Sequence, residues 1–321
     1  MSEWQVLVDG PIDDAGPDAI ADFASCTLVS TYADRAAVVE DAERYDAVVV
    51  RTWEVDRAFL EAATNLRVVA KHGAGLDNVD IPAASERGVV VANTPGVNAR
   101  SVAEHTVTLL LAVQKSVRPA DIDVHDGEWD RGRYDAHEVA GDVLGLFGCG
   151  DIGTAVSEMA RGLGMDVLVY DPYLAESDIP AGAERVTATR SLFDRADAVS
   201  VHTPLTEETR GAIGRAELRA LDGGVVVNTA RGGVVDEEAL VAALRAGEVA
   251  GAGLDVFASE PPADDDPLLA FRNVVTTPHV AGATDAAMRR MALGAAENVR
   301  TVYEGGLPES TVNADALDPT E

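Results

Sequence analysis

The sequence predicts an α/β protein built from two doubly wound parallel sheets, on three observations. Short apolar, β-branched runs alternate with helix-like stretches along most of the 321 residues, which is typical of βαβ units. The runs are continuously apolar, as in strands buried on both faces of a parallel sheet. The length suits two domains of roughly 100 to 200 residues each, and 47% hydrophobic residues can fill two cores.

The first hundred residues predict one βα series. Two helices are expected at residues 33–42 and 56–64, and Asp56 is placed to cap the second. The apolar runs predict strands at residues 6–8, 47–50, 67–70 and 89–92.

A long helix is expected after the break at Asn93, Thr94, Pro95 and Gly96. Ser101 followed by Glu104 forms a capping-box pattern that would open this helix, and Pro119 would end it near Val117. Apolar residues lie on all its sides, which suits a buried helix. Residues 121–142 predict an irregular arm.

A second βα series follows, matching a doubly wound dinucleotide-binding sheet. A last helix is expected at residues 285–304, followed by a polar acidic tail. The six strands are predicted at residues 143–147, 167–170, 198–202, 225–228, 251–254 and 274–276.

The charge balance excludes two classes of partner. There are 55 acidic residues against 25 basic ones, a formal net charge of -30, so nucleic acid and acidic membranes would be repelled. Lys71 and Lys115 are the only lysines. This composition resembles proteins of salt-loving archaea, because so many carboxylates repel one another unless salt screens them. The alternative is an acidic protein from an ordinary environment.

The cysteines and the hydropathy predict a cytoplasmic protein without a metal site. Cys26 and Cys149 are too few for a disulfide framework and lack metal-ligand spacing. No cationic segment precedes the first apolar stretch, and no apolar run approaches the roughly 18 residues of a membrane span.

A glycine motif stands between an expected strand and helix, at Gly148, Gly150 and Gly153. Such glycines permit a tight turn and close approach of a pyrophosphate to a helix N-terminus. Asp171 ends the next strand, where a carboxylate accepts hydrogen bonds from the adenosine ribose and repels the 2′-phosphate of NADP. The set predicts a Rossmann domain that binds NAD. Cys149, between the glycines, is interpreted as a small filler.

Three further motifs follow expected strands and carry Arg231, Glu260 and His279. Ligands of open α/β sheets bind at the carboxyl ends of strands, so these side chains are expected in one site. Taken singly, each has a simpler interpretation, as a surface ion-pair partner, a turn acid and a loop histidine.

Together the motifs resemble the D-isomer-specific 2-hydroxyacid dehydrogenase family, most closely its 3-phosphoglycerate dehydrogenase branch. The resemblance covers nearly the whole chain. Besides the motifs above, it includes residues 71–80, 93–95 and 201–206.

The resemblance implies hydride transfer between nicotinamide and C2 of a 2-keto or 2-hydroxy acid, catalysed by Arg231, Glu260 and His279. His279 would exchange a proton with the substrate oxygen, Glu260 would orient the imidazole and favour its protonated form, and Arg231 would hold the substrate. Backbone N–H groups at residues 71–75 would bind the substrate carboxylate as an anion nest. Cofactor-binding residues carried over are Gly148, Gly150, Asp151, Ile152, Gly153, Asp171, His202, Thr203, Pro204, Thr229, Ala230, Arg231, Asp255, His279 and Gly282. Substrate-binding residues are Arg51, Lys71, His72, Gly73, Ala74, Gly75, Arg231 and His279.

The resemblance leaves two classes of substrate open, phosphorylated and unphosphorylated acids. Arg51 and Lys71 are two cations that would bind the phosphate of 3-phosphoglycerate or 3-phosphohydroxypyruvate, which would place the protein in serine biosynthesis. Lysine lacks the bidentate fork of arginine, and Trp53 and His72 are bulkier than expected, which favours hydroxypyruvate, glyoxylate or another 2-keto acid. Glu260 stands where formate dehydrogenases carry glutamine, which argues against formate. The chain ends soon after its last helix, so we expect no serine-sensing domain and no feedback by serine.

The family pattern implies a substrate domain of flavodoxin-like type, at residues 1–98 plus 287–321, and an NAD domain at residues 99–286, with a cleft between them. Hinges are expected near residues 95–100 and 282–287. The long helix and the arm resemble the family's dimer contact and predict a homodimer. A rival of another class is a non-catalytic NAD-sensing protein of the same fold, for which the catalytic set would be dispensable.

Overall fold

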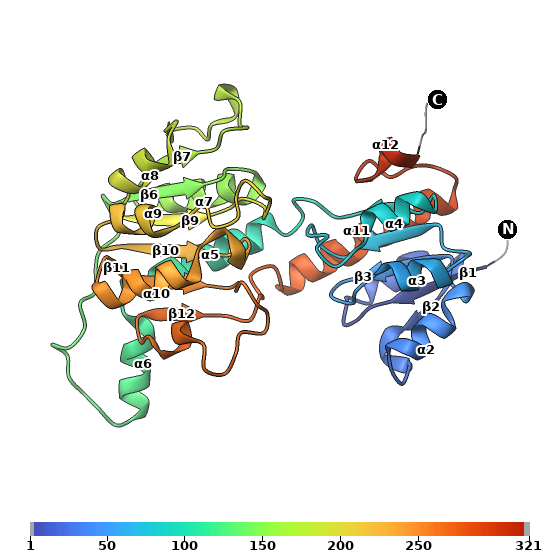
Figure 1. The fold of residues 1–321 in the computed structure, drawn as a ribbon, viewed down its shortest axis with the longest axis horizontal. Helices are drawn as coiled ribbons and strands as arrows, with labels where there is room; N and C mark the ends of the chain where they lie inside the picture. Colours follow the sequence, from blue (N-terminus) through green and yellow to red (C-terminus); the bar gives the residue numbers. More distant parts are fainter. Residues whose placement is uncertain (1–2, 318–321) are drawn as a thin grey trace. The chain divides into compact units, whose positions relative to one another are not determined.

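The structure is a computed structural model that describes residues 3–317. It divides into two compact units (Figure 1). The first contains the chain up to Asn98 and again from Ala283, and the second contains Ala99–Gly282. Both sheets are entirely parallel, which confirms the predicted fold class of two doubly wound α/β domains.

The sheet of the first unit has five strands in the order β2-β1-β3-β4-β5, the flavodoxin-like order. The strands are β1 Trp4–Val8, β2 Ala24–Leu28, β3 Ala47–Val50, β4 Val68–Lys71 and β5 Val90–Ala92. Strand β2 was not predicted. It lies at the sheet edge, its residues Ser25 and Cys26 are exposed, and it therefore lacks the apolar run of a buried strand.

Helices cover both faces of this first sheet. One face packs on α1 Ala15–Ile20 and α11 Asp285–Tyr303, through a core that joins Val6 and Val49 to Ala295 and Val299. The other face packs on α2 Arg35–Glu40, α3 Arg57–Ala62 and α4 Ile81–Glu86. Short elements complete the unit: η1 Val29–Thr31, η2 Ala42–Arg44 and α12 Ala314–Leu317. The expected acidic tail continues beyond Leu317, and residues 318–321 lie outside the described residues.

The sheet of the second unit has seven strands in the order β12-β11-β10-β9-β6-β7-β8. The change of direction beside β6 is the Rossmann arrangement. The strands are β6 Val143–Phe147, β7 Asp166–Tyr170, β8 Glu184–Arg185, β9 Ala198–Val201, β10 Gly224–Asn228, β11 Val249–Leu254 and β12 Val274–Thr276. Only β8, an edge strand of two residues, has no predicted counterpart.

Helices also cover both faces of the second sheet. On one side, α5 Ala99–Gln114 and α7 Asp151–Gly162 pack through Leu109, Leu110 and Val156. On the other side lie α8 Thr189–Arg195, α9 Arg215–Ala220 and α10 Glu237–Ala246. The remaining elements are α6 Val117–His125, η3 Glu176–Asp178, η4 Gly232–Val234 and η5 Pro267–Ala270.

Two predictions about the long helix were wrong. Helix α5 begins at Ala99, so Ser101 lies inside its first turn and is not the N-cap. It ends at Gln114, Ser116 adopts a left-handed φ of 52°, and α6 follows and extends into the first residues of the expected irregular arm. Pro119 lies in the first turn of α6, where backbone N–H groups have no helical acceptor and proline is tolerated.

Candidate active site

The predicted motifs of the second unit meet at one edge of its sheet. Strands β6, β9, β10, β11 and β12 are parallel neighbours, so the residues that follow them lie at the same edge. These are the glycine turn at Gly148 and the loops beginning at His202, Thr229, Asp255 and Thr277. This edge is where open α/β sheets bind ligands.

The glycine turn has the shape that a dinucleotide requires. A Cβ atom on Gly148, whose φ is 91°, would lie 2.8 Å from the carbonyl carbon of His202, and one on Gly153 would lie 2.8 Å from the carbonyl oxygen of Gly148. These two glycines therefore allow close packing of the strand, turn and helix. Gly150 faces open space and caps α7, with Asp151 and Ile152 in the first turn. Its free side is where a pyrophosphate can approach the helix N-terminus.

Asp171 is held in place at the end of β7. Its two carboxylate oxygens accept hydrogen bonds from the backbone N–H of Cys149 and of Tyr173, each at 2.9 Å. Each oxygen keeps a further lone pair for a ribose hydroxyl. The residues therefore fit NAD, which supplies or accepts the hydride when bound. Cys149 is buried, and burial raises the pKa of its thiol, which agrees with its interpretation as a filler.

Other predicted cofactor residues occupy the same edge. His202 donates to or accepts from Ser200 Oγ at 2.9 Å, and burial lowers the pKa of His202 to about 3, so its ring stays neutral. The carbonyl of Pro204, next to Thr203, accepts from Thr209 Oγ1. Thr229 is buried and its hydroxyl lies 2.8 Å from that of Thr106 on α5. The hydroxyl of Thr229 is therefore already engaged within the protein.

Glu260 and His279 form a direct pair. The Nδ1 of His279 lies 2.7 Å from Glu260 Oε2, and Glu260 Oε1 accepts from the backbone N–H of Phe257 at 3.1 Å. With Nδ1 bound to the carboxylate, Nε2 is the ring nitrogen left to exchange a proton. Half of the His279 side chain is exposed, as a group that meets a substrate requires.

Arg231 lies on the neighbouring loop and is fixed at its backbone. Its carbonyl accepts from Asn228 Nδ2 at 2.9 Å, and its Nη1 donates to the carbonyl of Ala230 at 2.7 Å. The next residue, Gly232, touches the loop that carries Glu260, because a Cβ atom there would lie 1.9 Å from the carbonyl carbon of Phe257. The loops of Arg231 and Glu260 are thus packed backbone against backbone.

Asp255, predicted only as a cofactor-binding residue, also forms several hydrogen bonds within the protein. Its carboxylate is fully buried and accepts from the backbone N–H of Val280 at 2.9 Å and of Ala281 at 2.8 Å. Its own carbonyl accepts from the N–H of His279 at 2.8 Å. Asp255 therefore holds the backbone of the loop that carries His279 and leads to Gly282.

The anion nest predicted in the first unit has fewer unoccupied N–H donors than expected. The N–H groups of His72 and Gly73 already donate, to the carbonyl of Val50 and to Thr94 Oγ1. Within residues 3–317, the N–H groups of Ala74 and Gly75 have no acceptor. His72 is 3% exposed, its Nε2 lies 3.2 Å from the Met288 carbonyl oxygen, and burial lowers the pKa of this histidine.

Lys71 is buried and its ammonium group serves the protein itself. The side chain donates to the carbonyl of Arg51 at 2.6 Å and to Asn78 Oδ1 at 2.5 Å, and the residue is 7% exposed. Asn78 in turn donates to the carbonyl of Trp53 at 2.7 Å. Lys71 thus fixes the backbone on which Arg51 stands.

Asp9 completes this arrangement and was not predicted from the sequence. A single carboxylate oxygen of Asp9 accepts from the N–H groups of Arg51, Thr52 and Trp53 at 3.0, 2.6 and 2.7 Å. The three donors are more than 40 residues away along the chain, so no local pattern marks this contact. The half-buried Arg51 is therefore held from both sides.

Residues 3–317 contain neither a metal-binding cluster nor a membrane-spanning helix. No cluster of three or more His, Cys, Asp and Glu side chains there is arranged to hold a metal ion. In the same residues, no helix has both the length and the apolar character needed to cross a lipid bilayer.

The fold and the glycine turn define the second unit as a dinucleotide-binding domain at whose strand ends an Arg, a Glu and a His are gathered. The family model for the NAD-binding domain of D-isomer specific 2-hydroxyacid dehydrogenases matches residues 107–281. The chain belongs to the D-isomer-specific 2-hydroxyacid dehydrogenase family, and NAD is the cofactor of this domain.

Relatives with two different activities resemble the chain. D-3-phosphoglycerate dehydrogenase of Archaeoglobus fulgidus is 38% identical over 319 residues, which are 99% of this chain but 60% of that protein. Hydroxypyruvate reductase of Thermotoga maritima is 37% identical over 303 residues, 93% of this chain and 98% of the reductase. The crystal structure of the TT0316 protein of Thermus thermophilus matches with a TM-score of 0.88 at 35% identity, covering 96% and 99% of the two chains.

Proposed function

We propose that this protein transfers a hydride between NAD and C2 of a 2-keto or D-2-hydroxy acid. The observation that carries the proposal is the 2.7 Å contact between Glu260 and His279 at the cofactor edge of the sheet. In reduction, His279 Nε2 gives a proton to the substrate oxygen while C2 receives the hydride, and oxidation reverses both transfers. Glu260 holds the imidazole at Nδ1, which leaves Nε2 for the proton exchange.

Arg231 is proposed to bind the acid group that all such substrates share. The planar fork of Arg231 suits a carboxylate. In the first unit, the N–H groups of Ala74 and Gly75 are proposed as further donors to an anionic group of the substrate. The N–H groups of His72 and Gly73 already donate to Val50 and Thr94.

For the rest of the substrate we propose 3-phosphohydroxypyruvate and 3-phosphoglycerate, which would place the protein in serine biosynthesis. Arg51 supports this choice, because Asp9 and Lys71 fix its backbone in a defined position. The second candidate is hydroxypyruvate, glyoxylate or a similar unphosphorylated acid. The engagement of the Lys71 ammonium by Arg51 and Asn78 favours this second candidate, since it occupies a cation that a phosphate would need.

The test compares kcat/KM for NADH oxidation with 3-phosphohydroxypyruvate, hydroxypyruvate, glyoxylate and pyruvate in molar KCl. A preference of at least about 100-fold for the phosphorylated acid, about 2.7 kcal/mol in the transition state, is expected for the first candidate. Arg51→Gln should then remove most of this preference. Equal or higher values with unphosphorylated acids identify the second candidate, and turnover of none of these acids contradicts both.

We propose that the protein is halophilic. The net charge of -30 makes the many surface carboxylates repel one another, and molar salt weakens this repulsion because it shortens the screening length to about 3 Å. We expect the melting temperature to rise by at least about 10 °C between 0.1 M and 2 M KCl, because screening removes repulsion in the folded state. Differential scanning fluorimetry measures this, and a rise below about 3 °C would contradict it.

We further propose a cytoplasmic homodimer. Exposed apolar side chains on α6 and in the following arm support the contact between copies, namely Val117, Val124 and Trp129. Light scattering should give twice the 33.5 kDa of one chain. The free thiols of Cys26 and Cys149 are compatible with a reducing compartment, and immunoblotting of cell fractions tests the location.

A further inference from the structure

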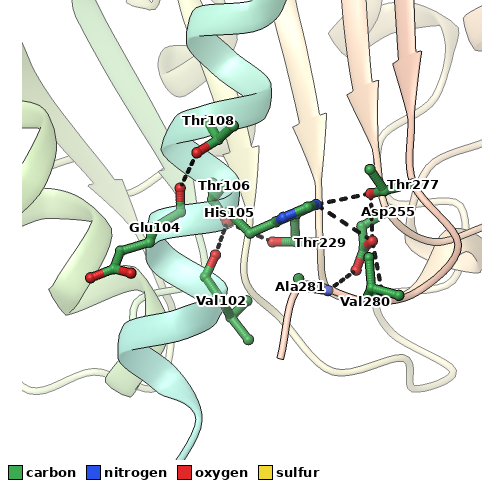
Figure 2. Close-up of polar contacts among 10 residues, drawn as sticks. All are labelled: Val102, Glu104, His105, Thr106, Thr108, Thr229, Asp255, Thr277, Val280 and Ala281. Carbon is green, nitrogen blue, oxygen red and sulfur yellow. Dashed lines mark hydrogen bonds and ion pairs between the residues drawn. The ribbon is translucent and has the colours of Figure 1, made fainter. Parts of the chain in front are cut away.

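His105 on α5 lies in a polar cluster with Thr277 and Asp255 (Figure 2). Its Nε2 is 2.9 Å from Thr277 Oγ1 and 3.6 Å from Asp255 Oδ1. Thr277 Oγ1 is 2.5 Å from the same oxygen of Asp255. The three side chains come from a helix, the end of β11 and the end of β12, and the His105 side chain is 22% exposed.

The distances fix the direction of the hydrogen bonds. The buried Asp255 carboxylate only accepts, so the short contact requires the Thr277 hydroxyl to donate its proton to Asp255. Thr277 Oγ1 can then only accept from His105, and Nε2 must carry a hydrogen. The chain of donors therefore runs from His105 to Thr277 to Asp255.

This series of hydrogen bonds includes Thr277, two residues before His279, and the N–H groups of Val280 and Ala281 directly after it. Asp255 Oδ1 accepts from Thr277 Oγ1 and from the N–H of Val280, and Oδ2 accepts from the N–H of Ala281. His279 itself has a left-handed φ of 51°, a conformation that is unfavourable for a residue with a Cβ atom and needs support from its surroundings. The Asp255 carboxylate supplies that support, and its orientation depends on the Thr277 hydroxyl.

The next residue on the helix makes a parallel contact. Thr106 Oγ1 lies 2.8 Å from Thr229 Oγ1 (Figure 2), two residues before Arg231. Two consecutive residues of α5 thus hold the loops that carry Arg231 and His279. No apolar packing requirement explains a histidine and a threonine at these positions, because α5 packs on the sheet through Leu109 and Leu110.

We infer that His105 is a positioning residue for the catalytic reaction. Through Thr277 it orients the carboxylate of Asp255, and through Asp255 it holds His279 in the left-handed conformation that places its imidazole against Glu260. This inference rests on the proposed role of His279 as the proton-exchanging group. His105 itself takes no part in the transfer of hydride or proton.

The test compares two substitutions at one position in the full chain. His105→Gln keeps an N–H donor near the position of Nε2, and His105→Leu removes it. For His105→Leu we expect kcat with the best acid of the substrate panel to fall by about 10- to 100-fold, the cost of slight misplacement of a reacting group. The Kd of NADH and the melting temperature should stay near the wild-type values, and His105→Gln should recover most of kcat.

A kinetic isotope effect separates positioning from a structural role. With NADH deuterated at the transferred position, the isotope effect on kcat should rise in His105→Leu, because a misplaced His279 makes the chemical step slower than product release. Thr277→Val and Thr277→Ser repeat the comparison should His105→Leu fold poorly. The double variant His105→Leu/Thr277→Val should be no slower than either single variant, since both break the same chain.

Two outcomes would overturn the inference. One is a kcat of His105→Leu within about twofold of wild type, well below the cost of a misplaced group. The other is an equal loss in His105→Gln and His105→Leu with an unchanged isotope effect. Substitution of His279 in the same assays keeps the two proposals apart: if that variant retains full kcat, the proposed function fails before the question of positioning arises.

Discussion

His279→Asn is expected to lower kcat by about 10²- to 10⁴-fold, the usual contribution of general acid–base catalysis. Asparagine is chosen because it tolerates the left-handed φ of 51° at this position, so the loop keeps its conformation. Its amide can meet Glu260 but cannot exchange a proton near neutral pH. Steady-state oxidation of NADH with the preferred 2-keto acid measures the loss.

The control for this prediction is His125→Ala. His125 lies on α6 with 79% of its side chain exposed and pairs only with Asp121 among the contacts described, so its removal should leave kcat unchanged. The Kd of NADH, measured by fluorescence, should stay within about threefold of wild type in the His279 variant, since the glycine turn and Asp171 are untouched. A kcat reduced by less than about tenfold would remove His279 from the proposed role.

The same experiment decides between an enzyme and an NAD sensor. A sensor of this fold needs the glycine turn and Asp171 but not the pair of Glu260 and His279. Binding of NADH without turnover of any acid by the wild-type protein would favour the sensor. The 2.7 Å contact of the pair and the engagement of both Glu260 oxygens argue for the enzyme, because a dispensable histidine would not require such support.

Most of the fold was predictable because the deciding features are local. Buried parallel strands are short apolar runs, as in Ala47–Val50 and Val143–Phe147, and the glycine turn between strand and helix is contiguous in sequence. Strand β2 was missed because an edge strand with exposed Ser25 and Cys26 has no apolar run. The pattern Ser101 to Glu104 misled because the same spacing also occurs inside a helix, and Ser101 is buried in α5.

For the candidate site, the sequence predicted the residues that lie in motifs but not the tertiary contacts that support them. Arg231, Glu260 and His279 each follow a strand, and parallel strands end at one edge, so their convergence follows from topology. The contact between His105 and Thr277 spans 172 positions, and a single histidine within an apolar helix carries no local pattern. The partners of Lys71 could not be predicted from the sequence for the same reason. Its charge led to the prediction of a phosphate ligand, but its contacts with Arg51 and Asn78 form only in the tertiary structure.

The second large effect is expected from one added methyl group, in Gly232→Ala. The new Cβ atom would lie 1.9 Å from the carbonyl carbon of Phe257, 2.2 Å from its oxygen and 2.3 Å from the nitrogen of Ala258. Carbon atoms in contact stand about 3.5–4.0 Å apart, and backbone atoms cannot turn aside as a side chain can. The loops of Arg231 and Glu260 must therefore separate.

We expect Gly232→Ala to destabilise the protein by at least about 3 kcal/mol, the upper end of overpacking effects. This corresponds to a fall in melting temperature of roughly 6–12 °C for a unit of this size. In the protein that remains folded, kcat should fall by at least about 10²-fold, because Arg231 moves away from the substrate by an ångström or more. Thermal denaturation and steady-state kinetics in molar KCl measure the two effects.

The adjacent glycine provides a matched control. A Cβ atom on Gly233 would meet only the ends of flexible side chains, Leu205 at 3.2 Å and Arg210 at 3.6 Å, so Gly233→Ala should cost less than about 1 kcal/mol. Neither glycine has a positive φ, so backbone strain does not separate the two substitutions. Their difference isolates the backbone contact with Phe257. Equal stability of the two variants would show that this contact does not hold the loops of Arg231 and Glu260 together.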